Sequence, residues 1–139
     1  MWVITKKDDG LLWMDFTINE VEHCIIPIFV DADSAMGFCD DIELDGAKLQ
    51  LINIDSAAKI GEIRDAIIES KASAVILDMP HPDLVTPDTE LAYWLGPDFQ
   101  DVLQKVVDLC KDHNEQEVIK VFNRYISNKS LEAQNHTEK

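Results

Sequence analysis

The first part of the chain alternates apolar and polar side chains on either side of a turn signal. Residues 1–5 and 11–17 show the two-residue period of β-strands, and the dipeptide Asp9–Gly10 between them favours a tight turn. We therefore expect an N-terminal β-hairpin, with Trp2 and Trp13 packed against each other across it.

Three later segments are rich in apolar residues and predict further strands. They cover residues 24–30, 48–54 and 73–78. The first and third are nearly unbroken apolar runs, which are typical of strands buried on both faces. Pro27 lies inside the first run, and because proline has no amide N–H, it predicts that one side of this strand is unpaired there or carries a bulge.

Helical periodicity occupies the gaps between these three strands. A helix should begin near residues 31–34, and its apolar positions recur at helical spacing: Ala35, Phe38, Cys39 and Ile42. A second helix should run from an N-cap at Asp55 or Ser56 to about Ser70. The order strand–helix–strand–helix–strand predicts parallel strands joined by right-handed crossovers.

The C-terminal half begins with a proline-rich segment and continues as two helices. Residues 79–98 hold four of the five prolines and predict a long loop, with a short strand as an option at residues 91–95. Asp98 should open a third helix, and a break at residues 111–114 should separate it from a fourth. Residues 128–139 are polar and predict a flexible tail.

These elements predict a single α/β (or α+β) domain spanning residues 1–127. It should contain a mixed sheet of about five strands, built from the N-terminal β-hairpin and a βαβαβ unit, with a C-terminal helical pair. The length of 139 residues suits one domain with its own apolar core.

Charge and cysteine usage restrict the classes of function. The chain has 27 acidic and 12 basic residues and a formal net charge of -15, so it should repel nucleic-acid backbones and anionic membrane surfaces. Its three cysteines, Cys24, Cys39 and Cys110, form no C-x-x-C pair, which favours reduced thiols. With no signal-peptide pattern at residues 1–7 and no long apolar run, we expect a cytoplasmic protein.

Two segments of the first 80 residues carry a resemblance to a known family. Residues 26–31 (Ile-Pro-Ile-Phe-Val-Asp) end one strand ahead of a helix, and residues 75–80 (Val-Ile-Leu-Asp-Met-Pro) end a later strand. With the aromatic hairpin before them, they are similar to the SseB-like N-terminal domain and related small bacterial proteins. The resemblance implies a bacterial α/β domain without an established catalytic activity.

Acidic residues follow each of the three central strands. Asp31 and Asp33 follow the first, Asp55 the second, and Asp78 the third, which His81 and Asp83 follow closely. If the strands are parallel neighbours, these groups share one edge of the sheet, where ligands bind in α/β proteins. Clustered carboxylates suit Mg²⁺, so Asp31, Asp33 and Asp78 are candidate metal ligands. The competing interpretation is that they cap helices and shape turns.

Two local motifs suggest what such a magnesium site would do. Residues 30–34 (Val-Asp-Ala-Asp-Ser) resemble the first motif of haloacid-dehalogenase-like phosphatases, in which the first Asp is the nucleophile and the second the general acid. Residues 78–80 (Asp-Met-Pro) are similar to the Asp-x-x-Met-Pro motif of response-regulator receiver domains. A Mg²⁺-dependent phosphate-handling protein is therefore the alternative function.

The uneven placement of charge favours binding over catalysis. From Asp8 to Asp45 there are eleven acidic residues and no Lys or Arg, and such a surface can steer a basic protein partner. No triad motif, phosphate-binding glycine loop or dinucleotide fingerprint is present. We therefore expect a non-catalytic interaction module, with a homodimer through the C-terminal helices as a further option. The candidate partner-binding residues are Asp40, Asp41, Glu43 and Asp45.

Overall fold

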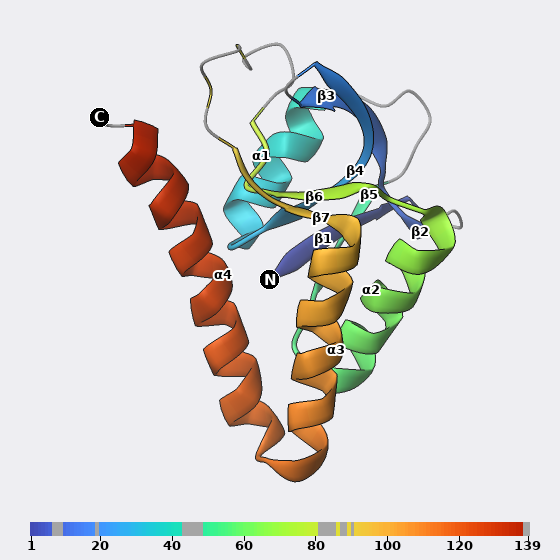
Figure 1. Cartoon of the computed structure of the whole chain (residues 1–139), viewed down its shortest axis with the longest axis vertical. Coiled ribbons are helices and arrows are strands. Elements are labelled where there is room, and N and C mark those ends of the chain that lie inside the picture. The colour runs from blue at the N-terminus through green and yellow to red at the C-terminus, as the bar shows by residue number, and fades with distance from the viewer. Residues whose placement is uncertain are drawn as a thin grey trace.

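The computed structural model describes residues 1–6, 10–18, 20–42, 49–80, 86, 89 and 91–137. Within these residues, seven strands form one mixed sheet: β1 (Trp2–Lys6), β2 (Gly10–Leu11), β3 (Met14–Ile18), β4 (Val21–Phe29), β5 (Leu49–Asn53), β6 (Ala74–Leu77) and β7 (Ala92–Leu95). Four helices accompany the sheet: α1 (Ala32–Ile42), α2 (Ala57–Ser70), α3 (Gly96–Asp112) and α4 (Glu115–Thr137) (Figure 1).

The sheet is built around β4. This strand pairs in parallel with β6 and antiparallel with β1 and β3. β1 also pairs antiparallel with β2 and with β5, and β6 pairs antiparallel with β7. The result is the mixed α/β architecture that the hydrophobic pattern predicts, in a single domain, with two more strands than the expected five.

The N-terminal hairpin is much shorter than predicted. β1 and β2 pair through two residue pairs only, and the chain then leaves β1 to form β3. β3 pairs with β4 over five residue pairs, and Glu20 takes a left-handed conformation (φ 68°) in the turn between them. The expectation that residues 11–17 return beside the first strand is therefore wrong for most of their length. From Met14 onward the chain pairs with β4 instead, in the β3–β4 hairpin.

The two N-terminal tryptophans do not face each other. Trp2 lies opposite Phe29 of β4 and Asn53 of β5. Trp13 lies between β2 and β3 with 48% of its surface exposed, and the ammonium of Lys6 lies 5.9 Å from the centre of its ring. The predicted Trp2–Trp13 contact is wrong because β3, which follows Trp13, belongs to β4.

The three strands expected to be parallel neighbours run in one direction, but only two are adjacent. β4 and β5 each pair antiparallel with β1, so they point the same way, and β6 is parallel to β4. β1 lies between β4 and β5, so the predicted order, in which the three strands are direct neighbours, is wrong. β1 is an interior strand because Val3 and Ile4 are fully buried on opposite faces of the sheet.

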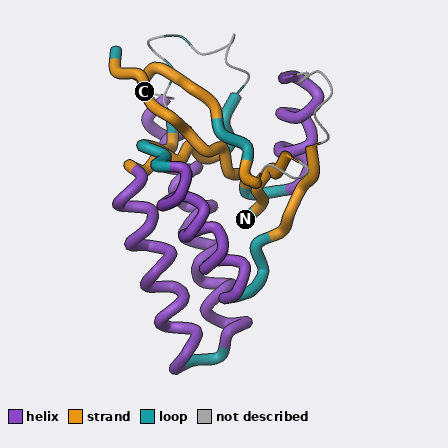
Figure 2. Tube along the Cα trace, turned by 90° about the vertical axis from the view of Figure 1, so that its right-hand side faces the viewer, coloured by secondary structure: helices purple, strands orange, loops and turns teal. Residues whose placement is uncertain are grey.

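Two apolar cores cover the two faces of the sheet. One core joins β4 and β6 to α2, α3 and α4 through residues such as Ile28, Val75 and Phe99. The other packs Phe29 and Ile76 beneath α1. In Figure 2, α2, α3 and α4 lie together on one side of the strands, and α1 lies apart from them. Both faces of β4 and β6 are thus buried, which explains their continuous apolar sequences.

Pro27 lies where β4 changes partner. β4 pairs with β3 as far as Ile25 and with β1 from Ile28 onward. Pro27 falls in the gap, where no ladder on this side needs its amide. The prediction of an unpaired side at this proline is confirmed.

The C-terminal helices begin and end close to the predicted places. α3 starts at Gly96 with Pro97 in its first turn, two residues before the expected start at Asp98. The predicted break is confirmed, since α4 starts after Asn114, whose side-chain Oδ1 accepts a hydrogen bond from the Glu117 amide at 3.2 Å. α4 continues to Thr137, so residues 128–137 extend the helix, and their flexibility stays a prediction. Among the described helices, none is both long and apolar enough to cross a membrane.

Candidate functional site

Asp78 ties the end of β6 to the end of β4. Its backbone is left-handed (φ 49°), and its amide donates to the Ile28 carbonyl at 2.7 Å. One of its carboxylate oxygens accepts a hydrogen bond from the Val30 amide at 3.0 Å. Asp tolerates the left-handed region better than most residues because its short polar side chain bonds locally. These contacts match the turn interpretation of Asp78.

Asp31 acts at the start of α1. Its Oδ1 accepts a hydrogen bond from the Ser34 amide at 2.8 Å, which satisfies one of the free N–H groups at the helix terminus. Asp33 lies in the first turn and is exposed to solvent. A carboxylate in this turn is also favoured by the helix dipole. The capping interpretation therefore accounts for Asp31.

Asp55 follows β5 and forms an ion pair on the surface. Its Oδ1 lies 3.0 Å from the Lys59 ammonium, and this hydrogen bond is the main cause that holds the pKa of Asp55 below its ordinary value. Ser56 is the N-cap of α2, with its hydroxyl accepting from the Lys59 amide at 3.2 Å. Because β1 separates β5 from β4, Asp55 stands apart from the ends of the two parallel neighbours.

The candidate magnesium ligands were Asp31, Asp33 and Asp78, and two of them hydrogen bond to backbone amides. Across the described part of the chain, no group of three or more His, Cys, Asp or Glu side chains is placed to hold a metal ion. His81 and Asp83 lie outside the described residues. The magnesium site therefore stays a hypothesis, without a described ligand cluster to support it.

The outward face of α1 combines two acidic side chains, one apolar side chain and a glycine. Asp33, Met36, Gly37 and Asp40 recur at intervals of three, one and three residues, so they share one side of the helix. All four are exposed, Met36 to 47% of its surface. A Cβ at Gly37 would meet no atom within 4 Å, so its small size serves no packing inside the chain. We call these four residues the α1 face.

The four predicted partner-binding residues begin on this helix. Asp40 belongs to the α1 face, and Asp41 is the next residue of the same helix. Glu43 and Asp45 lie outside the described residues. Neither Asp33 nor Asp40 forms an ion pair with any residue that the structure describes. The sequence could indicate the acids, but the contribution of Met36 and Gly37 required the helix orientation.

The three cysteines are free and half-buried. Burial raises the pKa of each thiol above its ordinary value, and a neighbouring carboxylate adds to the rise: Asp15 for Cys24, Asp40 for Cys39 and Glu115 for Cys110. A raised pKa lowers the thiolate fraction at neutral pH, which is the reactive form. None of the three has the environment of an activated nucleophile.

A serine–histidine contact escaped sequence reasoning. The Ser73 hydroxyl lies 2.9 Å from Nδ1 of His23 and accepts a hydrogen bond from the Cys24 amide at 3.1 Å. The hydroxyl therefore binds a backbone N–H of β4 just before β6 begins. Among the described residues no carboxylate hydrogen bonds to His23, so the pair lacks the third member of a catalytic triad. No local motif could have signalled it, because the two residues are fifty positions apart.

The geometry of the described residues explains most of the candidate groups by local contacts. It presents capped helices, satisfied turn carboxylates, unreactive thiols and one exposed helix face with mixed acidic and apolar character. The chain matches no protein-family model and no curated protein.

Proposed function

We propose that the protein is a non-catalytic interaction module that binds a basic protein partner on the α1 face. The observation that carries the proposal is the placement of Asp33, Met36, Gly37 and Asp40 on one exposed side of α1. The two acids would attract cationic side chains, and Met36 would bury its thioether against the partner. Gly37 would let the partner's backbone come close to the helix.

The electrostatic setting supports this choice of partner. The segment that contains α1 has no Lys or Arg between Asp8 and Asp45, and no ion pair among the described residues involves Asp33 or Asp40. Opposite charge speeds encounter and discriminates between partners more than it adds affinity. Burial of the methionine side chain supplies about 1.5–3 kcal/mol, which corresponds to about tenfold or more in affinity.

The test compares two matched triple variants of the tagged chain in pull-downs from cell lysate. The first carries Asp33→Asn, Met36→Gln and Asp40→Asn on the α1 face. The control carries Glu62→Gln, Ile68→Gln and Glu69→Gln on α2, where two exposed acids seven residues apart accompany an exposed isoleucine. Both variants lose two negative charges and one apolar side chain, so only the location differs.

At low salt, we expect the wild type and the α2 control to retain the same basic proteins. The α1 variant should lose them. Retention should fall as the salt concentration rises, because screening weakens charge attraction. If the α1 variant retains the same proteins as the wild type, or if the wild type binds none at low salt, the proposal fails.

The proposal includes two elements that rest on the sequence. The resemblance to the SseB-like N-terminal domain supports a bacterial protein of a family without an established catalytic activity, and the cysteine pattern, which favours reduced thiols, supports a cytoplasmic location.

A further inference from the structure

The fourth helix carries a second apolar stripe, which the described residues leave largely exposed. Ile119, Phe122 and Ile126 of α4 are buried against the rest of the chain. Val121 and Tyr125 lie on another side of the helix, with 63% and 47% of their surfaces exposed. Single exposed apolar residues are ordinary, but two that follow each other by one helical turn form a strip.

This exposed strip has the spacing of a coiled-coil seam. Val118, which is half-buried, precedes Val121 by three residues, and Tyr125 follows by four. The three-four alternation is that of the a and d positions of a heptad repeat. The ring of Tyr125 also contacts the buried Trp94 (ring centres 6.3 Å apart), so one end of the strip is held in place.

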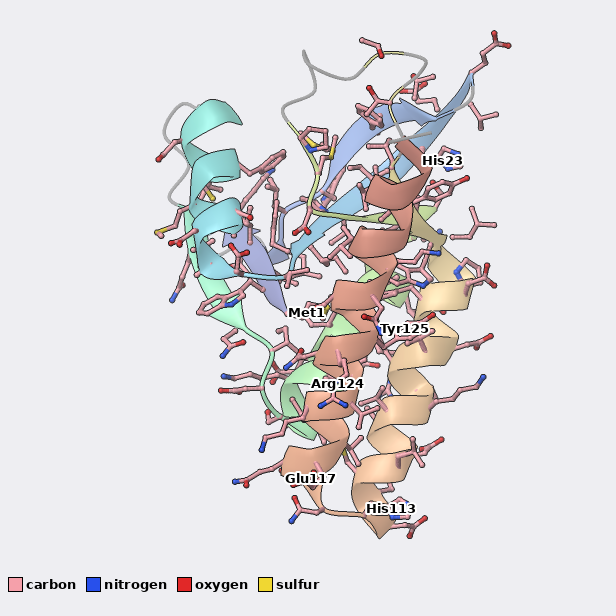
Figure 3. All side chains as sticks on the ribbon, turned by 90° about the vertical axis from the view of Figure 1, so that its left-hand side faces the viewer. Met1, His23, His113, Glu117, Arg124 and Tyr125 are labelled. Carbon is pink, nitrogen blue, oxygen red and sulfur yellow. The ribbon has the colours of Figure 1, made fainter. Side chains whose placement is uncertain are left out.

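Two opposite charges flank the strip on one side. Glu117 and Arg124 are exposed and seven residues apart, so they occupy the same heptad position. Neither forms an ion pair with a described residue. Figure 3 shows both along the outer side of α4, with Tyr125 near Arg124.

From this pattern we infer that α4 is the interface of a twofold homodimer, in which two copies pack antiparallel along Val118, Val121 and Tyr125. In an antiparallel pair, residues of this flanking heptad position face one another. A twofold axis between Val118 and Val121 pairs Glu117 of each copy with Arg124 of the other. The interface is self-complementary, as a twofold dimer requires.

The charges also select the register. In the chosen register, Val118 of one copy packs against Val121 of the other, and both charge pairs form. In a register shifted by one heptad toward the C-terminus, Arg124 of one copy would face Arg124 of the other. Like charges directly opposite each other disfavour that alternative.

The charge of the helix favours a second copy over a basic partner. The whole of α4 carries three basic and three acidic residues, a net charge of zero, in a chain whose net charge is -15: Lys120, Arg124, Lys129, Glu115, Glu117 and Glu132. Two such acidic chains repel each other over most of their surface. They can approach most easily along this helix, and this inference is independent of the α1 face.

Analytical ultracentrifugation of the full chain tests the dimer, from about 1 µM to about 1 mM, which spans weak to moderate affinity. The buffer should contain about 0.15 M salt, so that the Debye length of about 8 Å screens the overall repulsion. We expect a reversible monomer–dimer equilibrium. Val121→Asp should weaken it more than about tenfold, because it places a charge at the centre of the seam.

Charge reversal then tests the orientation. Glu117→Arg alone and Arg124→Glu alone should each weaken the dimer by about fivefold, and the double variant should restore it. Lys120→Glu is the matched control, since Lys120 is exposed on α4 but lies away from the strip. The unfolding midpoint of each variant, measured in parallel, separates loss of the interface from loss of the helix.

Three results would overturn the inference. The first is a monomer at every concentration, which would also result if the strip served a different partner. The second is a dimer that Val121→Asp leaves intact. The third is a double charge reversal that fails to restore the dimer. The last two would show that a dimer forms through another surface or in another register.

Discussion

Among the four glycines that the structure describes, Gly96 is predicted to be the one whose replacement the fold tolerates least. It begins α3, and its amide donates to the Ser73 carbonyl at 2.9 Å. A Cβ built at Gly96 would lie 2.2 Å from the carbonyl oxygen of Ala72, a backbone atom that no side-chain rotation can move. Gly96→Ala must therefore push the start of α3 away from the segment that precedes β6.

The size of the effect follows from two terms. Overpacking a tight contact costs about 1–3 kcal/mol, and the strained or lost hydrogen bond between Gly96 and Ser73 costs about 1 kcal/mol more. The expected loss in the free energy of unfolding is about 2–4 kcal/mol, within the typical total of about 5–15 kcal/mol. The variant should fold, but with a clearly lower stability.

Gly37→Ala provides a matched control with the opposite sign. Gly37 lies inside α1, and a Cβ there meets nothing within 4 Å. The same glycine-to-alanine change should therefore stabilise the chain by about 0.5–1 kcal/mol through helix propensity alone. Urea unfolding of both variants measures the difference, with m-values compared to check that the transition is unchanged in kind. Equal shifts for the two variants, or a neutral Gly96→Ala, would refute the packing argument.

Four further predictions concern titration, helix capping, metal binding and thiol chemistry. Burial lowers the pKa of the Met1 amine below its ordinary 8.0, against the opposing Asp55 carboxylate, so the unfolded chain binds the proton more tightly. The free energy of unfolding should therefore rise with pH between the lowered folded pKa and about 8, and be level on either side of this window; urea midpoints should show the slope, and Nα-acetylation should remove it. Asp31→Ala should cost about 1 kcal/mol through loss of the α1 cap, measured by urea unfolding. Millimolar Mg²⁺ should leave the melting temperature unchanged, whereas a rise that disappears in Asp78→Asn would establish the magnesium hypothesis. All three thiols should react slowly with iodoacetamide at neutral pH by mass spectrometry, and fast modification of the folded chain would contradict their raised pKa.

Of the four residues of the α1 face, the sequence predicted only Asp40 as a partner-binding residue. The acidic run identified Asp40, and the helical period placed it on α1. Which other residues share the outward side depends on how the helix sits on the sheet. Phe38 turns inward against Phe29, with ring centres 5.4 Å apart, and this contact leaves Met36 and Gly37 outside.

The expected metal cluster illustrates the opposite case. The carboxylates do follow strands that point the same way, as the apolar runs and their order predicted. Three of the side chains, however, are engaged one by one with nearby partners: Asp31 with the Ser34 amide, Asp55 with the Lys59 ammonium and Asp78 with the Val30 amide. Such local bonds depend on side-chain orientation, which a strand-end position does not specify.

By itself, the sequence determined the elements whose causes are local. The apolar period set the helices of residues 32–42 and 57–70, the Ser56 cap marked where the second begins, and Pro27 marked a break in one ladder. Only the tertiary structure decided the pairing: β1 lies between β4 and β5, and β3 joins β4. The alternation of apolar residues predicts which faces of a strand meet the core. It does not predict the neighbouring strand, because any strand with the same pattern could pair there. The neighbours are chosen by which arrangement covers both faces of the sheet at once.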